Sequence, residues 1–364
     1  MNNELAKQAN PSSNGTLIGP DDLILVTGAT GFIGSRVVCS LLNLGSRNLR
    51  CLARPSSNAE KVGAMRESLP PGARLELVRG NLLSREDCAA IVRNAAVIIH
   101  LAAGRSEKSV PDAFANSVVT TRNLLEAAAQ QGGVRRFVNI SSFAVYSNRN
   151  QARRGRLDES CPVEDKPALR GDAYSFSKVR QDEMVEEYGK KLGIPYVIVR
   201  PGYVYGPGNL GITNRVGIGT FGLFLHLGGS NSIPFTYVDN CADAIALAGV
   251  TAGIDGEVFN VVDDDLPSSR QFLRWYKREV RRFPSLYVPH FMSYALCYLW
   301  ERYSEWSEGQ LPLAFNRKKW HNVWKKTTYT NQKLKTRMPW APRVSTKDGM
   351  QRYFEACRAG GTNA

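Results

Sequence analysis

The chain has 364 residues, of which 43% are hydrophobic and 22% charged, which is enough for one large domain or two joined lobes with a substantial core. Its formal net charge of +14 favours polyanionic partners such as phosphate-bearing ligands or an anionic membrane surface, but no nucleic-acid-binding module is visible, so we expect no nucleic acid partner. No stretch reaches the ~20 apolar residues that cross a bilayer, and the seven scattered cysteines, without a Cys-x-x-Cys pair, argue against a disulfide or metal framework and for the reducing cytoplasm.

Residues 1–21 are polar and contain Asn, Ser, Gly and Pro. They lack the apolar segment of a signal peptide and carry too few apolar side chains to form a core. We therefore expect a disordered tail here.

A strand, a glycine turn and a helix follow this tail. Leu23–Val26 is a short apolar run, typical of a strand buried on both faces, and a helical pattern of apolar residues begins at Phe32. Between them, Gly28, Gly31 and Gly34 recur at three-residue spacing. In this context the first glycine allows a tight turn, the second lets the backbone approach a pyrophosphate, and the third lets the helix pack close to the strand. The segment therefore predicts a dinucleotide-binding site.

The end of the second strand bears on the choice of dinucleotide. Leu49–Ala53 is the apolar run of this strand, and proteins that prefer NAD carry an acidic residue just after it. Here the first acidic residue is Glu60, and Arg54 occupies the position. Because an arginine suits a 2′-phosphate, we expect NADP to be preferred over NAD.

Further apolar runs alternate with helical patterns along the first half of the chain. Leu75–Val78, Ala96–His100, Phe137–Ser141 and Tyr196–Arg200 are expected strands, and Asn116–Gln130 and Tyr174–Leu192 are expected helices. This alternation predicts an α/β fold with a doubly wound parallel sheet of the Rossmann type, which binds ligands at the carboxyl ends of its strands. No two of the four histidines have metal-ligand spacing, so we expect no metal, and His100 is expected to be a core residue.

Tyr174 and Lys178 lie one helical turn apart on one face of the second expected helix. The lysine charge favours the phenolate and lowers a tyrosine pKa that starts near ~10, which makes Tyr174 a usable general acid or base near neutral pH. The same spacing recurs at Tyr329 and Lys333 in the C-terminal part, where we expect a structural role only.

These motifs together resemble the extended branch of the short-chain dehydrogenase/reductase superfamily. That branch holds nucleotide-sugar epimerases and dehydratases, dihydroflavonol-type reductases and 3β-hydroxysteroid dehydrogenases. The resemblance spans residues 22–355 and is carried by Thr27-Gly-Ala-Thr-Gly-Phe-Ile-Gly34, Ser141-Ser-Phe-Ala-Val-Tyr146 and Tyr174-Ser-Phe-Ser-Lys178. In character the chain is most similar to the 3β-hydroxysteroid dehydrogenase-like proteins.

The resemblance implies roles for single residues. Tyr174 would transfer a proton, Lys178 would tune Tyr174 and hydrogen-bond the nicotinamide ribose, and Ser142, with Ser141 next best, would polarise the substrate oxygen. Serines at a strand end also form simple turns. Asn116 would support the active site, although an N-cap role explains an asparagine there equally well.

The resemblance also implies a set of cofactor-binding residues that lie at the carboxyl ends of the strands. They are Gly28, Thr30, Gly31, Phe32, Ile33, Gly34, Arg54, Asn81, Leu82, Leu101, Ala102, Ala103, Tyr174, Lys178, Pro201 and Val204. At Asn81 the chain departs from the family, which usually has an aspartate beside the adenine.

The second half of the chain has a different pattern, with Gly and Pro clustered at residues 201–208. Phe235–Val238 and Val258–Val262 are expected strands, and Cys241–Val250 is an expected helix. The resemblance implies a dinucleotide-binding domain over residues 22–202, with later contributions of a strand and a helix, and a smaller substrate lobe over residues 203–355. Residues 356–364 are expected to be a tail.

The expected substrate is bulky and largely apolar, sterol- or lipid-like, and hydride would pass between nicotinamide and its alcohol or ketone. Nucleotide-sugar enzymes usually have an arginine just before the strand at Phe235, where this chain has Ser, Ile and Pro. Val216–Leu227 is Gly-rich and apolar, and we expect a loop with few charges here, which favours a hydrophobic ligand or, equally, a core segment. A nucleotide-sugar epimerase or dehydratase is the alternative, and a non-enzymatic cofactor-binding protein is the second alternative.

One segment of the C-terminal part suggests a membrane surface. Ser285–Trp300 has no charged residue and follows Arg281 and Arg282, and the stretch from Arg317 to Lys326 mixes basic and aromatic residues. Such sequences suit the interface of an anionic bilayer, so we expect peripheral membrane binding. For the protein as a whole we expect a cytoplasmic location and a homodimer. The alternative is a helix packed on the rest of the protein.

Overall fold

The structure is a computed structural model that describes residues 15–57, 60–67, 69–104, 109–148, 155–220, 222–308, 310 and 315–360. Its centre is a seven-stranded sheet in the order β12-β7-β5-β4-β1-β2-β3, and all neighbours are parallel. The strands are β1 (Leu23–Thr27), β2 (Asn48–Ala53), β3 (Arg74–Arg79), β4 (Ala95–His100), β5 (Arg136–Ile140), β7 (Tyr196–Pro201) and β12 (Val258–Val261). The order reverses between β1 and β4, so the doubly wound sheet is confirmed, and its switch point lies where the glycine turn leaves β1.

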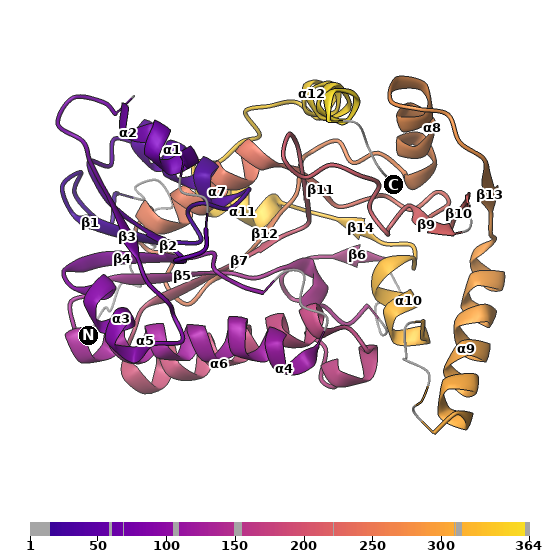
Figure 1. Ribbon diagram of the computed structural model, residues 1–364, viewed down its shortest axis with the longest axis horizontal. Helices are drawn as coiled ribbons and strands as arrows, with labels where there is room; N and C mark the ends of the chain where they lie inside the picture. Colours follow the sequence, from indigo (N-terminus) through magenta and orange to yellow (C-terminus); the bar gives the residue numbers. More distant parts are fainter. Residues whose placement is uncertain are drawn as a thin grey trace, which may run out of the picture.

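Helices cover both faces of this sheet (Figure 1). One face carries α1 (Gly34–Asn43), α2 (Glu60–Glu67), α7 (Val238–Val250) and α11 (Gln332–Arg337). The other carries α3 (Arg85–Val92), α6 (Ala173–Leu192) and a continuous helix made of α4 (Val110–Ala113), η1 (Phe114–Val119) and α5 (Thr120–Gln131). Because both faces are covered, β1, β4 and β5 are buried along their whole length, as their apolar runs predict.

The helix expected to start at Asn116 begins earlier. Ser109 caps it by accepting a hydrogen bond from the backbone N–H of Asp112, and Pro111 lies in its first turn. Asn116 lies inside the helix, in the π-helical segment η1, so the N-cap explanation for Asn116 is wrong.

The elements outside the central sheet and its covering helices form small sheets and helices, and we call them together the second lobe. β8 (Tyr203–Tyr205) pairs with β11 (Phe235–Tyr237), β6 (Arg156–Leu157) pairs with β14 (Thr328–Tyr329), and β9 (Gly217–Thr220), β10 (Leu223–His226) and β13 (Ser285–Tyr287) form a three-stranded sheet. Its helices are η2 (Phe143–Val145), η3 (Pro167–Arg170), α8 (Ser269–Glu279), α9 (His290–Trp306), α10 (Arg317–Val323) and α12 (Thr346–Ala359).

The Gly-rich segment Val216–Leu227, expected to be an apolar loop, is an antiparallel hairpin of β9 and β10. Its glycines have a packing reason, because a Cβ atom on Gly217 would overlap the carbonyl group of Leu225 on the neighbouring strand.

Part of each expected tail packs on the fold. Thr16 forms a bridge with Thr251, the backbone N–H of Leu17 donates to Val250 O, and Ile18 is buried. At the other end, α12 continues to Ala359 and buries Cys357. Residues 1–14 and 361–364 lie outside the described part. Within the described part, no helix combines the length and the apolar character needed to cross a membrane.

Candidate active site

The turn between β1 and α1 needs its glycines for three different contacts. Gly28 has a φ of +71°, and a Cβ atom on it would lie 2.9 Å from the backbone N of Ala102. A Cβ atom on Gly34 would collide with the carbonyl group of Gly28, and one on Gly31 would lie 3.1 Å from Gly28 O. A side chain has no room at Gly28 and Gly34 and would crowd the turn at Gly31, so the turn leaves bare backbone at the N-terminus of α1.

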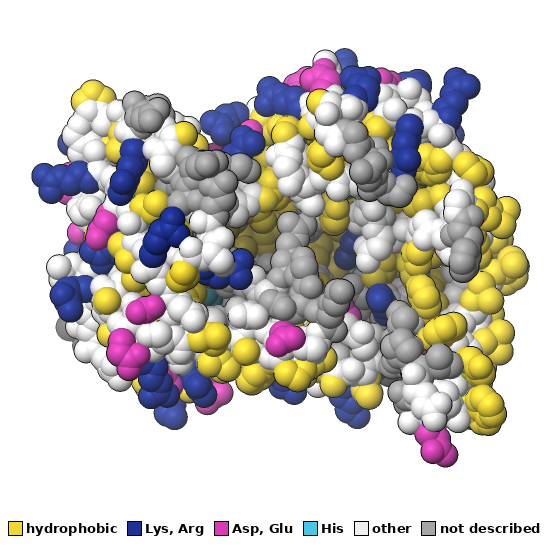
Figure 2. Space-filling model, in the orientation of Figure 1, with side chains coloured by type: hydrophobic (Ala, Val, Ile, Leu, Met, Phe, Trp, Pro, Cys, Tyr) yellow, Lys and Arg dark blue, Asp and Glu magenta, His cyan; other side chains and the backbone are white. Residues whose placement is uncertain are grey.

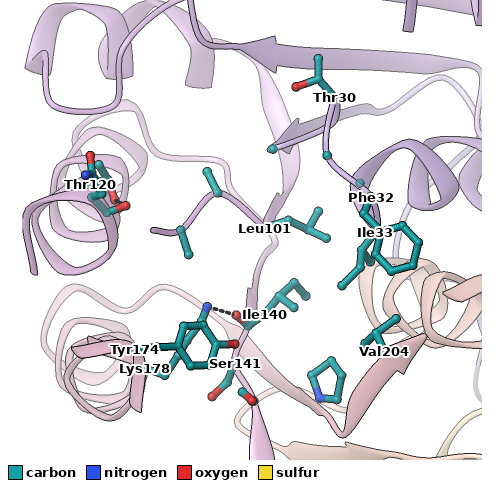
Figure 3. A pocket seen from close by; sticks show the side chains of 18 of the residues that line it. Thr30, Phe32, Ile33, Leu101, Thr120, Ile140, Ser141, Tyr174, Lys178 and Val204 are labelled. Carbon is teal, nitrogen blue, oxygen red and sulfur yellow. Dashed lines mark hydrogen bonds between the residues drawn. The ribbon is translucent and has the colours of Figure 1, made fainter. Parts of the chain in front are cut away.

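This turn opens into a cavity of about 610 Å³ at the carboxyl ends of β1, β2, β4, β5 and β7 (Figure 3). All eighteen residues expected at the site line the cavity: Gly28, Thr30, Gly31, Phe32, Ile33, Gly34, Arg54, Asn81, Leu82, Leu101, Ala102, Ala103, Asn116, Ser142, Tyr174, Lys178, Pro201 and Val204. The bare glycine turn at the N-terminus of α1 and the cationic side chains of Arg54 and Lys178 in the cavity lining fit a dinucleotide.

Ser141, which the sequence placed second to Ser142, also lines the cavity. The cavity has further lining residues that the sequence did not reveal: Leu52, Ser57, Thr120, Ile140, Asp172, Gly202, Tyr203 and Asn214. Asp172 is the N-cap of α6, where its carboxylate accepts hydrogen bonds from the backbone N–H of Tyr174 and the hydroxyl of Ser175. The sequence contains a signal for this cap, because aspartate is a preferred N-cap residue and Asp172 stands just before the expected helix. Asp172 fixes the first turn of the helix that carries Tyr174.

Tyr174 and Lys178 extend from the same face of α6 into the cavity, next to the end of β5 (Figure 3). Lys178 is buried, and its Nζ donates to Ile140 O at 2.6 Å and to Oε1 of Gln181 at 2.9 Å. Burial lowers the pKa of Lys178 to about 8, and the charge of Asp182 opposes this shift. The ammonium group is therefore held at a fixed position by two acceptors.

The two adjacent serines differ in their partners. Ser141 is buried and donates to Oδ2 of Asp182 at 2.8 Å, where Asp182 also pairs with Arg200 at 3.0 Å. Ser142 is half-buried, lines the cavity, and its Oγ accepts a hydrogen bond from the backbone N–H of Ala144. The hydroxyl hydrogen of Ser142 is therefore the one available to a ligand.

A chain of buried polar groups lies behind Lys178. Nε2 of Gln181 donates to Oγ1 of Thr121 at 2.8 Å, and His100 bridges Thr121 at 2.9 Å and Thr27 at 2.8 Å. The hydroxyl of Thr121 donates to Ser117 O, so Thr121 accepts from Nε2–H of His100, which assigns the tautomer. Burial, with a smaller contribution from Lys178, lowers the pKa of His100 to about 3. His100 is a satisfied core residue, as expected.

The far end of the cavity carries the residues that bear on cofactor choice. Arg54 is exposed directly after β2, and no ion pair of Arg54 is found in the described part of the chain. Asn81 accepts a hydrogen bond from the backbone N–H of Leu83, while its own backbone N–H donates to Asp87 at 2.7 Å. The acidic residue that the family usually has at position 81 is thus absent from the cavity wall.

A second cavity of about 170 Å³ continues from the first on the side of Tyr174. The two share Ser142, Asp172, Tyr174, Gly202, Tyr203 and Asn214. The smaller one adds three cationic side chains, those of Arg170, Arg215 and Lys319. Arg170 is paired with Glu164 at 3.3 Å, whereas Arg215 contacts Asn322 O and the hydroxyl of Tyr329, with no acidic partner in the described residues.

The segment Val216–Leu227 lines neither of these two cavities in its described residues. The expected apolar contacts with a ligand are therefore not supplied by this hairpin. Its side chains Val216 and Leu227 belong to the lobe core.

The second Tyr-x-x-x-Lys copy does not reproduce the pair on α6. Tyr329 lies in β14 and stacks on Phe143 with ring centroids 5.6 Å apart, while Lys333 lies in α11 and pairs with Glu257 at 3.3 Å. Because the two residues lie on different elements, they do not share a helix face. No group of three potential metal ligands occurs in the described ranges.

Comparison with known proteins matches residues 24–261 to the model of the NAD dependent epimerase/dehydratase family. A trifunctional UDP-glucose 4,6-dehydratase/UDP-4-keto-6-deoxy-D-glucose 3,5-epimerase/UDP-4-keto-L-rhamnose-reductase from Arabidopsis thaliana is 29% identical over 256 residues, which cover 65% of this chain and 36% of that protein. Cinnamoyl-CoA reductase 1 from Oryza sativa subsp. japonica is 33% identical over 202 residues, which cover 55% of this chain and 57% of that protein. A 3 beta-hydroxysteroid dehydrogenase/Delta 5-->4-isomerase from Mycobacterium tuberculosis (strain ATCC 25618 / H37Rv) is 32% identical over 194 residues, with 51% and 48% covered. The match thus spans between about a third and three fifths of these relatives' own length.

Two solved structures have the same fold. UDP-glucuronic acid 4-epimerase from Bacillus cereus, in complex with UDP-glucuronic acid and NAD, superposes with a TM-score of 0.68 at 21% identity, covering 93% of this chain and 99% of that one. UDP-glucose 4-epimerase from Thermus thermophilus, in complex with NAD, gives 0.64 at 23% identity, covering 93% and 100%. At these identities the likeness establishes the architecture alone.

Proposed function

The chain belongs to the NAD dependent epimerase/dehydratase family, among the extended short-chain dehydrogenases/reductases, and from this membership we propose that it catalyses hydride transfer at an alcohol or ketone carbon. A bound nicotinamide cofactor accepts or supplies the hydride. The observation that carries the proposal is the convergence of Ser142, Tyr174 and Lys178 on one cavity that begins at the glycine turn. A non-enzymatic cofactor-binding protein would not need this set.

Each of the three residues has a chemical task. Tyr174 passes a proton to or from the substrate oxygen, as a phenol positioned by the capped first turn of α6. Ser142 donates its hydroxyl hydrogen to the same oxygen and stabilises charge that develops there. Lys178, held by Ile140 O and Gln181, places a positive charge one turn from Tyr174 and stabilises the phenolate. Asn116 lines the same cavity from the π-helical segment η1, which packs against α6, and such π-helical turns often serve a site.

For the cofactor, we propose NADP in preference to NAD. Arg54 follows β2 at the position where an acidic residue would hold the 2′-hydroxyl of NAD, and its guanidinium suits a 2′-phosphate. The family membership itself concerns NAD, so this preference rests on Arg54.

For the substrate, we propose a bulky, largely apolar alcohol or ketone with an anionic or strongly polar group near the reacting carbon. Arg215 and Lys319 line the small cavity together with Tyr174 and Ser142, and an anionic or strongly polar group of the substrate would complement Arg215, which has no acidic partner among the described residues. The apolar character is supported by the absence of an arginine before Phe235 and by the relative named as a 3 beta-hydroxysteroid dehydrogenase.

A nucleotide-sugar epimerase or dehydratase is the second candidate. The same two cations favour it, since a sugar diphosphate is polyanionic, and the Arabidopsis thaliana relative is named for such reactions. Both candidates use Tyr174 in the same way and differ in what occupies the small cavity.

For the cellular compartment, we propose the cytoplasm. All seven cysteines are free, which supports the expected reducing compartment.

The test is a turnover assay of the purified chain with NADPH or NADP against a panel of hydrophobic ketones and alcohols and a panel of UDP-sugars. We expect turnover from the first panel and a loss of about 10²-fold or more in kcat for Tyr174→Phe, with cofactor binding retained. Tyr188→Phe, on the same helix but away from both cavities, is the control and should keep the parent rate. Turnover of UDP-sugars alone would establish the second candidate, and parent-like rates for Tyr174→Phe would remove this residue from the mechanism.

A further inference from the structure

Helix α9 carries large apolar side chains on its outward side as well as on the side that packs on the protein. Its inward side buries Ser293, Cys297 and Ser304. Its outward side carries large apolar side chains, of which Leu299 is 60% and Trp306 76% exposed. Figure 2 shows these hydrophobic side chains gathered along the edge of the molecule that β13 and α9 occupy in Figure 1. We call this surface the α9 face; its members are Leu286, Tyr287, Phe291, Met292, Leu296, Tyr298, Leu299, Tyr303 and Trp306.

We propose that the α9 face docks the protein on the surface of an anionic lipid bilayer, with the helix lying in the plane of the interface. An apolar face of this extent is costly in water and marks a binding surface. This proposal concerns where the protein works and does not depend on the reaction that it catalyses.

The width of the face favours a bilayer over a second helix. At 100° per residue, the exposed apolar positions from Tyr298 round to Leu296 span an arc of about 160°, interrupted by Arg302 alone. A helix-to-helix seam needs only a narrow stripe of two positions in seven. A broad arc is what a helix half-immersed in an interface presents.

The chemistry of the face also fits lipid. Tyr298, Tyr303 and Trp306 are aromatic side chains with a polar end, a type that prefers the level of the headgroups. Arg281 and Arg282 are exposed just before β13, and no acidic residue occurs between them and Trp300. The acidic residues farther along α9, Glu301 and Glu305, are paired with Arg317 and Arg302 at 2.8 Å. The face is therefore apolar, with Arg281 and Arg282 before it in the chain and one exposed acidic residue, Glu308, after it. The two arginines complement anionic headgroups.

The stretch Arg317–Lys326, which the sequence suggested as part of the membrane surface, contributes Arg317 to the edge of the α9 face, where its guanidinium lies 4.8 Å from the ring centroid of Tyr298. Several other side chains of this stretch have partners elsewhere. Lys318 pairs with Glu164, Lys319 lines the small cavity, and Trp324 is buried.

Helix α10, which lies in this stretch, links the α9 face to the active site. Trp320 donates to Ser293 of α9 at 2.9 Å, while Lys319 and Asn322 of the same helix α10 line the small cavity. One helix thus separates the proposed membrane surface from the substrate.

The experiment is sedimentation of the full chain with vesicles, first of phosphatidylcholine alone and then of phosphatidylcholine with phosphatidylserine, at low and high salt. We expect binding to the vesicles with phosphatidylserine and its weakening by salt. Leu296→Gln together with Leu299→Gln should weaken vesicle binding at least about tenfold, because two exposed leucines lose their transfer into the interface. These side chains are already exposed, so the fold should persist, which far-UV circular dichroism and the melting temperature check.

The matched control is Leu44→Gln together with Leu192→Gln, two exposed leucines far from the α9 face, which should bind vesicles like the parent. Equal losses in both double variants, or no binding of the parent chain at low salt, would overturn the proposal. Sedimentation velocity without lipid supplies another test. If the parent chain is a dimer there and only the Leu296/Leu299 variant is a monomer, a second copy of the chain occupies the α9 face and the proposal is overturned.

Discussion

Ser141 and Ser142 are adjacent in the chain but differ in what their hydroxyl groups can do, because of one hydrogen bond. Since β5 ends at Ile140, their side chains point to different sides, and the hydroxyl of Ser141 is consumed by Asp182. Asp182 in turn pairs with Arg200, and burial raises the pKa of the Asp182 carboxyl, an effect that Arg200 opposes. Ser141 thus belongs to a buried structural cluster, and Ser142 remains for the substrate oxygen. The family resemblance favoured Ser142 over Ser141 but gave no physical reason. The reason is Asp182 on α6, about forty residues later in the chain, which takes the hydroxyl of Ser141.

The buried Lys178 should make stability depend on pH. Its pKa is lowered from 10.5 to about 8, so between these pH values the unfolded chain binds a proton that the folded chain has released. The free energy of unfolding therefore gains a contribution that rises with pH across this window, by at most about 3 kcal/mol. We expect Lys178→Met to lose this rise, as measured by urea unfolding from pH 8 to 10.5 in both proteins. Burial raises the pKa of Cys51 to about 12, so this thiol ionises between pH 8 and 10.5 only in the unfolded chain, and it does so in both proteins. The difference between the two curves therefore isolates Lys178, and parallel curves would contradict the prediction.

Arg54 should decide between the two dinucleotides. It is exposed and lies at the end of β2, where a 2′-phosphate would extend. We expect the parent chain to bind NADPH more tightly than NADH, and Arg54→Ala to weaken NADPH about tenfold, or about 1.4 kcal/mol, while leaving NADH unchanged. Quenching of the six tryptophans reports both affinities. Equal affinities in the parent chain, or an equal loss for both cofactors in the variant, would refute the assignment.

Among the elements, the β1–α1 unit tolerates least change. A Cβ atom on Gly34 has no room because the carbonyl of Gly28 occupies the space, and both groups are backbone that cannot rotate away. We expect Gly34→Ala to lower the free energy of unfolding by about 3 kcal/mol or more, through a shift of α1 against β1. Gly63→Ala is the matched control, since Gly63 lies in helix α2 with nothing near its Cβ position, and it should stabilise by about 0.5–1 kcal/mol. Urea unfolding compares the two, and a similar small effect of both would show that the turn adapts.

The elements that the sequence predicted well are those with one dominant signal. The strands of the central sheet begin and end within one residue of their apolar runs, because burial on both faces favours apolar side chains along most of each strand. Buried polar residues inside them, such as Asn139 and Asn260, have hydrogen-bond partners in the fold. The hairpin of β9 and β10 was missed since its glycines are typical of loops, and their reason, the close approach of Gly217 to Leu225, is tertiary. Likewise, the composition of α9 indicated an apolar helix, but which of its sides faces outward depends on α10, which covers Ser293.

In the whole molecule, the site lies between the sheet and the second lobe, and each contributes one half. The sheet supplies the glycine turn, Arg54 and the α6 pair, all in positions that the strand order dictates. The lobe supplies Arg215 before β9 and Lys319 on α10, which come together only in the folded chain. This division explains why every expected residue of the cofactor half lines the cavity, whereas the cations of the substrate half were not foreseen.

The cations of the lobe lead to a prediction about substrate binding. If an anionic group of the substrate lies between Arg215 and Lys319, removing one charge should raise KM while leaving kcat near the parent value, because the group is bound equally in the ground state and the transition state. We expect Lys319→Gln to raise KM for an accepted substrate by about tenfold, since a charged hydrogen bond contributes roughly 1.5–3 kcal/mol. Lys326→Gln changes the net charge equally on the exposed surface nearby and serves as the control. Cofactor affinity should stay unchanged in both variants. A parent-like KM for Lys319→Gln would mean that the small cavity takes a neutral group, whereas an equal rise in both variants would indicate the field of the whole +14 molecule rather than a site.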